Sequence, residues 1–307
     1  MTTALISHED CADHITPPGH PEQVARLDAV LGALEGFDLQ RVKAPLAAED
    51  DLLRVHPQAH IDAIRAAAPD AGWRSLDADT HMSVGTLKAA YRGAGGVVRA
   101  VDMVLGGEVR NAFVAMRPPG HHAERQTAMG FCFFGNVAIG AKYALDHHGL
   151  ERVAIVDFDV HHGNGTQDLI EDDARILFCS THQSPLFPGT GAADEVGVGN
   201  VLNVPLPEGT GSQAFRDVIT QIVLPRLDAF SPQLVIISAG FDAHMNDPLA
   251  GMRLTTEDFG WVTARLCDVA DTHCEGKVVS SLEGGYDLAA LGASAAAHVK
   301  VLEERGR

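Results

Sequence analysis

The sequence predicts a single α/β domain spanning residues 1–307, with a parallel sheet covered by helices on both faces. Short runs rich in Val, Ile and Leu alternate along the chain with longer segments of helical periodicity. The short runs are apolar at successive positions, which is typical of strands buried on both faces of a sheet. No Pro/Ser/Gly linker, repeat or long run of like charges divides the sequence, so one domain is the simplest interpretation.

Six segments have the pattern of buried strands, and in chain order they are 112–116, 153–160, 176–180, 201–204, 234–238 and 277–282. The segments between them have helical periodicity, most clearly over 83–105, 136–147 and 213–227. Gly106 and Gly149 follow two of these helices at the position where glycine commonly ends a helix.

Charge and composition exclude several classes of protein. The chain has 41 Asp and Glu against 23 Lys and Arg, a formal charge of −18, so a nucleic-acid partner is not expected and a cationic partner is favoured. No apolar stretch has the length of a membrane span, and no signal peptide is recognisable, so we expect a soluble cytoplasmic protein without membrane association. The five cysteines predict free thiols.

Polar residues follow four of the predicted strands. They form the segments 117–122, 157–165, 239–244 and 283–286, which carry most of the Asp, His and Tyr side chains of chemical interest. Because the carboxyl ends of parallel strands meet at one edge of a sheet, we expect the four segments to converge on one crevice.

The segment from Asp157 to His161 predicts a metal site. If the strand continues, Asp157, Asp159 and His161 share one face, and Asp242 would add a ligand from another strand end. Zinc accepts carboxylate oxygen and histidine nitrogen, and a catalytic zinc has three protein ligands and one open position. Ferrous iron or cobalt suits similar ligands. The alternative is that the carboxylates cap helices and the histidine is a core residue.

His121 and His122 follow a Pro-Pro-Gly turn and are expected to divide two tasks. One ring would be oriented by Asp157, and the other, with Asn164 accepting its hydrogen bond, would move protons. Tyr286 follows two glycines and could donate to a developing oxyanion. A second pair, 147–148, falls in the last turn of a predicted helix, where a structural interpretation is preferred.

Five motifs together resemble the zinc-dependent histone deacetylase family, which includes bacterial histone deacetylase-like amidohydrolases and acetylpolyamine amidohydrolases. The motifs are Arg117-Pro-Pro-Gly-His-His122, Asp157-Phe-Asp-Val-His-His-Gly-Asn-Gly165, Phe187-Pro-Gly-Thr-Gly191, Gly240-Phe-Asp-Ala243 and Glu283-Gly-Gly-Tyr286. The resemblance runs from about His20 to Tyr286, and Asn164 and the Glu-Gly-Gly form are similar to the class II branch.

The resemblance implies an arginase-like fold with an eight-stranded parallel sheet and the removal of acetyl or other acyl groups from acetyl-lysine-type amides by metal-activated water. It implies one catalytic Zn²⁺ on Asp159, His161 and Asp242. It also implies His122 as the general base and acid beside His121, with Tyr286, Asp157 and Asn164 completing the catalytic set. It also implies a structural K⁺ site and an acyl-lysine tunnel. The implied K⁺ residues are Asp157, Asp159, His161, Ser180 and Thr181, and the tunnel residues are Gly130, Phe131, Phe187, Leu249 and Gly284.

Other functions are compatible with parts of the sequence. The substrate could be an acetylated polyamine instead of an acetylated lysine side chain, although Leu249 stands near the position where polyamine-selective relatives place an acid; Glu22, Asp79 or Glu124 could supply that charge instead. A binuclear manganese ureohydrolase would require further carboxylates where this chain has His244. A catalytically silent protein that binds an acylated ligand is a third class, and a homo-oligomer is left open.

Overall fold

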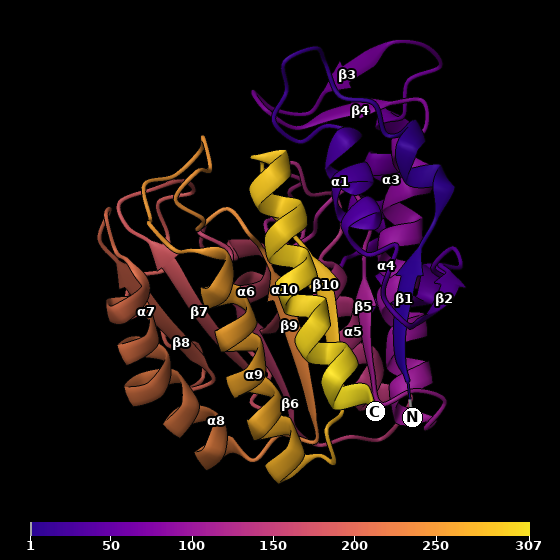
Figure 1. Ribbon diagram of the computed structural model, residues 1–307. Helices are drawn as coiled ribbons and strands as arrows, with labels where there is room; N and C mark the ends of the chain where they lie inside the picture. The colour runs from indigo at the N-terminus through magenta and orange to yellow at the C-terminus, as the bar shows by residue number, and fades with distance from the viewer. Residues whose placement is uncertain (1) are drawn as a thin grey trace.

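A computed structural model describes residues 2–307 and contains an eight-stranded sheet in which every pair of neighbouring strands is parallel (Figure 1). The strand order is β2-β1-β5-β10-β9-β6-β7-β8. In chain order, the strands are β1 (Thr3–Ser7), β2 (Leu39–Lys43), β5 (Asn111–Val114), β6 (Val153–Asp157), β7 (Ile176–Gln183), β8 (Val201–Leu206), β9 (Leu234–Ala239) and β10 (Val278–Leu282).

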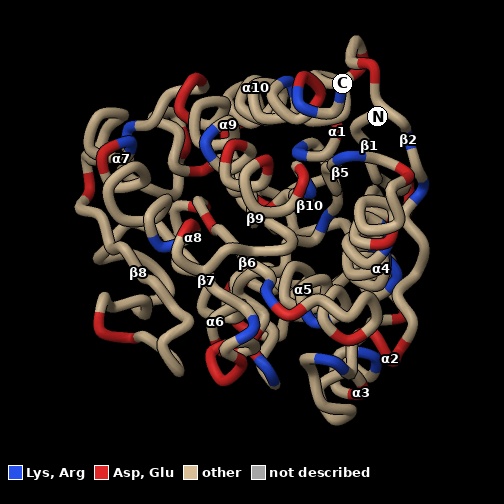
Figure 2. The backbone as a smooth tube through the Cα atoms, turned by 90° about the horizontal axis from the view of Figure 1, so that it is seen from below, with Lys and Arg blue, Asp and Glu red and all other residues tan. Residues whose placement is uncertain are grey.

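Helices cover both faces of this sheet. Viewed along the strands, α1, α9 and α10 lie on one side and α4, α5 and α6 on the other (Figure 2). The helices are α1 (Ala25–Ala33), α2 (Glu49–Leu52), α3 (Gln58–Ala67), α4 (Thr86–Leu105), α5 (Asn136–Asp146), α6 (Asn164–Ile170), α7 (Ser212–Val218), α8 (Leu224–Phe230), α9 (Thr256–His273) and α10 (Leu288–Gly306), with a 3₁₀ turn at Glu9–Asp13 and a π turn at Ile219–Val223.

The central strands begin with consecutive apolar residues and are buried along their whole length. Every residue of β6, β7, β9 and β10 is buried, as a sheet with helices on both faces requires. The edge strand β2 has the sequence Leu-Gln-Arg-Val-Lys and is half-exposed or exposed at each position. Charged side chains on an exposed edge oppose pairing with a further strand.

The predicted α/β fold class is confirmed, with differences at individual elements. The six predicted strands correspond to β5 through β10, whereas β1 and β2 were not predicted. Strand β6 ends at Asp157 and not at residue 160. The helix predicted over 213–227 is interrupted by the π turn, after which Pro225 opens α8. The helix predicted from residue 83 begins at Thr86, because Ser83 belongs to a small antiparallel pair of β3 (Trp73–Ser75) and β4 (His81–Ser83).

The register aligns the carboxyl ends of the strands. Asp157 pairs with Ser180 on β7 and Ser238 on β9, and Leu282 pairs with Ala239. The four polar segments therefore leave the sheet at one edge, and β3 and β4 lie at the same end of the molecule (Figure 1). No helix within residues 2–307 is long and apolar enough to cross a membrane. All five cysteines are free and buried.

Candidate active site

Two aspartates and one histidine form a buried cluster at the carboxyl edge of the sheet. Suitable ligand atoms of Asp159, His161 and Asp242 all lie within 4.8 Å of one another. His161 Nδ1 is 3.1 Å from Asp159 Oδ1 and 3.2 Å from Asp242 Oδ2. For comparison, tetrahedral ligands at about 2.1 Å from zinc are roughly 3.4 Å apart. The cluster therefore has the size and donor types of a metal site.

Asp159 and His161 are brought together by turns and not, as expected, by a continuing strand. The strand ends at Asp157, so the alternation of side chains along a strand does not place Asp159 and His161. A chain of turns places them instead: the Asp159 amide donates to Asp157 Oδ1 at 3.0 Å, and the His161 amide donates to Asp159 Oδ1 at 2.9 Å. Asp242 joins from the end of β9, where its Oδ1 accepts the Val160 amide at 2.8 Å.

The charges of the cluster favour a bound cation. Asp242 Oδ2 is buried and has no hydrogen-bond partner among the described residues. Burial and the nearby Asp159 carboxylate raise the pKa of Asp242 to about 7. Burial alone would lower the pKa of His161, but Asp159 and Asp242 raise it to about 10. Two carboxylates thus compete for one imidazolium proton, and a divalent cation would satisfy both carboxylates and the neutral ring.

The adjacent histidines have different partners. His121 Nδ1 lies 3.0 Å from Asp157 Oδ2, and His122 Nδ1 lies 2.8 Å from Asn164 Oδ1. Burial alone would lower the pKa of His121, but Asp159 and Asp157 raise it to about 10. Burial, followed by the charge of His121, lowers the pKa of His122 well below its ordinary value. The pKa values of the two rings therefore shift in opposite directions, which favours a protonated His121 and a neutral His122.

Gly165 permits the close packing that brings Asn164 to His122. A Cβ atom at Gly165 would lie 2.4 Å from the Ala123 carbonyl oxygen, so a larger residue would push the two segments apart. The Thr166 amide also donates to the His121 carbonyl at 3.0 Å. The sequence His-His-Gly-Asn-Gly thus sets the start of α6 directly against the turn that carries both histidines.

A cavity of about 380 Å³ opens onto this group. His122, His161 and Tyr286 line it, together with four residues expected in a tunnel wall: Gly130, Phe131, Phe187 and Leu249. The Phe187 ring meets His122 edge-on at 5.1 Å, and Phe131 meets Tyr286 at 5.9 Å between ring centroids. Burial raises the pKa of the Tyr286 phenol well above its ordinary value, so the hydroxyl keeps its proton.

Gly284 has a different position from the one expected. It does not belong to the cavity lining. Its amide instead donates to Asp159 Oδ2 at 2.8 Å, and a Cβ atom there would come within 2.0 Å of Asp242 Oδ2. The residue therefore lies behind the acidic cluster, where only glycine leaves room for both carboxylates.

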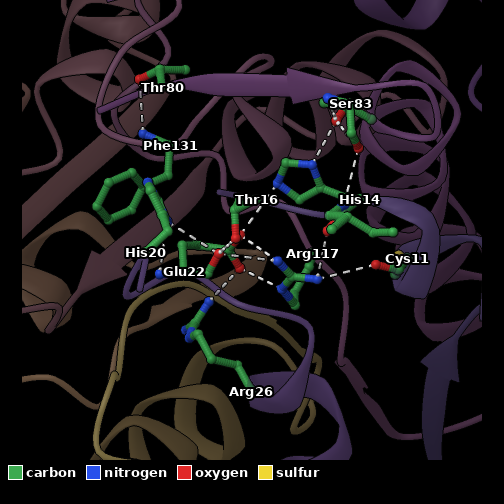
Figure 3. Close-up of polar contacts among 12 residues, drawn as sticks. Cys11, His14, Thr16, His20, Glu22, Arg26, Thr80, Ser83, Arg117 and Phe131 are labelled. Carbon is green, nitrogen blue, oxygen red and sulfur yellow. Dashed lines mark hydrogen bonds and ion pairs between the residues drawn. The ribbon is translucent and has the colours of Figure 1, made fainter. Parts of the chain in front are cut away.

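Sequence reasoning missed a buried ion network around Glu22 (Figure 3). Glu22 is fully buried, and its carboxylate contacts Arg117 at 2.5 Å, Arg26 at 3.0 Å and His14 at 3.2 Å. Arg26 also donates to the Gly285 carbonyl at 2.6 Å, and its guanidinium lies 4.8 Å from the centroid of the Tyr286 ring. Glu22 precedes α1 and Arg26 lies in its first turn, and their spacing of four residues was the available signal.

The three acids considered for the cavity mouth have separate positions. Asp79 lines the cavity, together with His20 and His81. Glu22 is in the ion network just described, and Glu124 accepts a hydrogen bond from the Asn164 side chain at 2.8 Å.

Two other histidine groups lie outside the cavity lining. His147 and His148 follow α5 as expected, and their ring nitrogens lie near Asp102 of α4, with His148 Nε2 at 2.9 Å from its carboxylate. His244 accepts the Asn246 amide at 3.2 Å, and its ring stacks on Phe259 with 6.5 Å between centroids.

Comparisons with known proteins agree with this geometry. A family model described as Histone deacetylase domain matches residues 20–302. A probable deacetylase of Archaeoglobus fulgidus is 40% identical over 301 residues, which cover 94% of this chain and 82% of the relative. A histone deacetylase-like amidohydrolase of Pseudomonas aeruginosa is 43% identical over 288 residues, which cover 90% and 75%.

A comparison with solved structures agrees with the sequence comparisons. The crystal structure of the HDA15 HD domain matches with a TM-score of 0.94 and 36% sequence identity, covering 99% of this chain and 89% of the other. The single α/β domain with its eight parallel strands thus has the arginase/deacetylase-like fold. The chain is a deacetylase-type amidohydrolase and belongs to the histone deacetylase family.

Proposed function

We propose that the protein is a zinc-dependent deacetylase that hydrolyses acetyl-lysine-type amides. The observation that carries the proposal is the buried cluster of Asp159, His161 and Asp242, whose His161 lines a cavity together with His122 and Tyr286. These three residues would hold one Zn²⁺, which when bound polarises the amide carbonyl and lowers the pKa of a water molecule. Membership of the histone deacetylase family agrees with this chemistry.

In the proposed reaction, His122 moves the protons. Its Nδ1 faces Asn164 Oδ1, which leaves Nε2 to take a proton from the attacking water. The same ring then gives a proton to the leaving amine. His121, whose pKa the Asp159 and Asp157 carboxylates raise, would contribute positive charge to the site. The products are acetate and a free amine.

Tyr286 would stabilise the negative charge that develops on the carbonyl oxygen. Its phenol stays protonated because of burial, so it can donate a hydrogen bond to that oxygen. The Arg26 guanidinium lies over the Tyr286 ring, 4.8 Å from its centroid, and helps to hold the phenol in place. The aromatic walls of Phe131 and Phe187 suit the methylene stem of an acylated lysine, which carries no charge before its amide.

We also propose a structural K⁺ beside the catalytic metal. The residues implied for it lie on two neighbouring strand ends, because Asp157 pairs with Ser180 and the turn through Asp159 and His161 follows directly. Thr181, which follows Ser180 in β7, is implied in this site through its backbone. Oxygen donors from carbonyl, carboxylate and hydroxyl groups suit a hard cation.

An acetylated polyamine is the second candidate substrate, and one observation favours it. Asp79 is the one acidic residue among the described residues that line the cavity, and a carboxylate there could attract a secondary ammonium. Against this, Leu249 lines the cavity, and the Asp247 carboxylate turns away to accept the amides of Leu249 and Tyr286.

One assay separates these substrates. Initial rates of acetate release are measured with an acetyl-lysine peptide and with acetylspermidine, each with and without a metal chelator. We expect faster release from the peptide and loss of both activities on chelation. A strong preference for acetylspermidine would overturn the substrate proposal, and full activity in chelator would overturn the metal proposal.

A further inference from the structure

We propose that Glu124 is a positioning residue that fixes the ring tautomer of His122 through the side chain of Asn164. The inference rests on the proposed function, in which His122 is the general base. Glu124 Oε1 accepts from Asn164 Nδ2 at 2.8 Å, and Asn164 Oδ1 lies 2.8 Å from His122 Nδ1. The three side chains thus form a continuous relay from a half-buried carboxylate to the catalytic ring.

The direction of the Asn164 amide decides where His122 carries its proton. An asparagine alone could turn either end toward the ring, because its oxygen and nitrogen occupy equivalent positions. The Nδ2 end lies between Glu124 Oε1 and, at 3.4 Å, Met129 Sδ, and both of these atoms are acceptors. An ionised carboxylate cannot donate, so Nδ2 must face Glu124 and Oδ1 must face the ring.

This orientation leaves one productive tautomer. Because Oδ1 can only accept, His122 must carry its proton on Nδ1, and Nε2 keeps the lone pair that takes a proton from water. If the amide turned around, its NH₂ group would face Nδ1 and move the ring proton to Nε2. The ring could then no longer act as a base.

The backbone keeps Glu124 and Asn164 together. The Glu124 amide donates to the Thr127 carbonyl at 2.9 Å, and the Arg125 amide donates to Asp168 Oδ2 at 2.7 Å. Asp168 belongs to α6, the helix that begins with Asn164. The turn that carries Glu124 is therefore anchored to the same helix as the amide that it orients.

The two histidines also differ in the group that contacts each ring. His121 contacts the Asp157 carboxylate directly, whereas an amide separates His122 from the Glu124 carboxylate. A carboxylate in direct contact favours a charged imidazolium, and an amide favours the neutral ring that a general base requires. Glu124 can thus orient the ring without placing a negative charge against it.

The first test replaces the carboxylate with an amide. In Glu124→Gln, the new side chain can donate as well as accept, so it no longer fixes the direction of Asn164. We expect kcat to fall about tenfold with KM unchanged, since only proton transfer is impaired. In ¹⁵N-histidine-labelled protein, with the His122 signal assigned from its absence in His122→Ala, the ring proton should leave Nδ1 in a measurable fraction of molecules. A ring that stays fully protonated at Nδ1 would overturn the inference, whatever the activity.

The second test exchanges the two groups. Asn164→Asp alone sets two carboxylates against each other and should lower kcat about 100-fold. Adding Glu124→Gln restores a donor opposite the new carboxylate, so the double variant should regain at least about tenfold over Asn164→Asp. A double variant that is no more active than Asn164→Asp contradicts a relay between these positions.

Glu49→Gln is the matched control, because Glu49 also accepts from an amide side chain, Gln58 Nε2 at 2.8 Å, but lies in α2. It should keep the wild-type kcat. Failure of the proposed function is recognised separately: wild-type protein would then release no acetate, whereas the position of the His122 ring proton would still decide the inference.

Discussion

At the scale of single residues, the hydroxyl group of Tyr286 offers a test of the proposed chemistry. Replacing it with Phe removes the hydroxyl but keeps the ring against Arg26 and Phe131. We expect Tyr286→Phe to lower kcat by about 10² to 10³, as the loss of one oxyanion donor does in other hydrolases. Elemental analysis should still find about one zinc per chain. Unchanged turnover would contradict the role proposed for the phenol.

Asp242 tests the metal site itself. Its Oδ2 is buried without a partner among the described residues, and it faces His161 Nδ1. Asp242→Ala should therefore abolish tight zinc binding, with bound metal falling from about one equivalent to near zero after dialysis. Asp247→Asn is a useful control, since Asp247 is buried nearby but accepts only backbone amides. Stoichiometric zinc in Asp242→Ala would refute the ligand assignment.

Individual residues differ in how far the sequence predicts them. The partners of His121 and His122 were predictable, because adjacent imidazoles in one site need different neighbours, and Asp157 and Asn164 occupy the next polar segment. For Glu124, the sequence suggests only a charge at the cavity mouth. Its contact with Asn164 depends on how a turn packs against α6, which residue spacing does not specify.

At the scale of elements, the Glu22 network joins segments that are distant in sequence. Glu22 and Arg26 belong to the N-terminal part of the chain, whereas Arg117 follows β5, and all three side chains are fully buried. Glu22→Gln would leave two buried guanidinium groups without their counter-charge. We expect the free energy of unfolding to fall by about 3–5 kcal/mol in urea titrations. Glu49→Gln, which breaks an exposed pair with Arg65, should cost less than about 1 kcal/mol.

The same network predicts a dependence on pH. Burial alone would raise the pKa of Glu22, but Arg117, His14 and Arg26 hold it well below the ordinary value. A carboxyl whose pKa is lowered by folding stabilises the protein above its unfolded pKa, about 4.3, and loses that contribution as the pH falls toward the folded value. The stability difference between wild type and Glu22→Gln should be largest above about pH 5 and shrink in acid. A difference that grows as the pH falls would contradict this assignment.

The strands that the sequence predicts correctly are the buried ones. Strands β6, β7, β9 and β10 were recognised because each begins with consecutive apolar residues. Strand β2, at the sheet edge, has Gln, Arg and Lys between its apolar residues and gives no such signal. The end of β6 was misplaced because Phe158 and Val160 continue the apolar pattern after the backbone has turned. Turns held by Asp157 and Asp159 side chains replace the sheet there, and hydropathy does not report them.

At the scale of the whole molecule, the formal charge of −18 bears on substrate capture. Acidic positions lie on helices and loops of both faces (Figure 2). We therefore expect kcat/KM for an acetyl-lysine peptide flanked by Lys or Arg to fall roughly 3- to 10-fold as ionic strength rises from about 0.05 to 0.5 M. A peptide with neutral flanks should change little. Equal salt dependence for the two peptides would exclude attraction by the surface charge.

The whole architecture was more predictable than its details. Polar segments after successive buried strands were sufficient to predict a crevice at one sheet edge, because the topology of parallel strands requires it. The number of strands followed from the family resemblance. The position of Gly284 behind the carboxylates, instead of in the cavity wall, depends on distances of a few ångströms that no sequence pattern contains.

The central claim is that one zinc ion on Asp159, His161 and Asp242 enables amide hydrolysis, and titration of the metal tests it most directly. Chelator-stripped protein is titrated with Zn²⁺ in a K⁺-containing buffer, and acetate release from an acetyl-lysine peptide is measured at each addition. We predict negligible release without zinc and a rise that saturates at one equivalent per chain, absent from Asp242→Ala. Full activity in the stripped protein, or saturation only at two equivalents, would contradict the account.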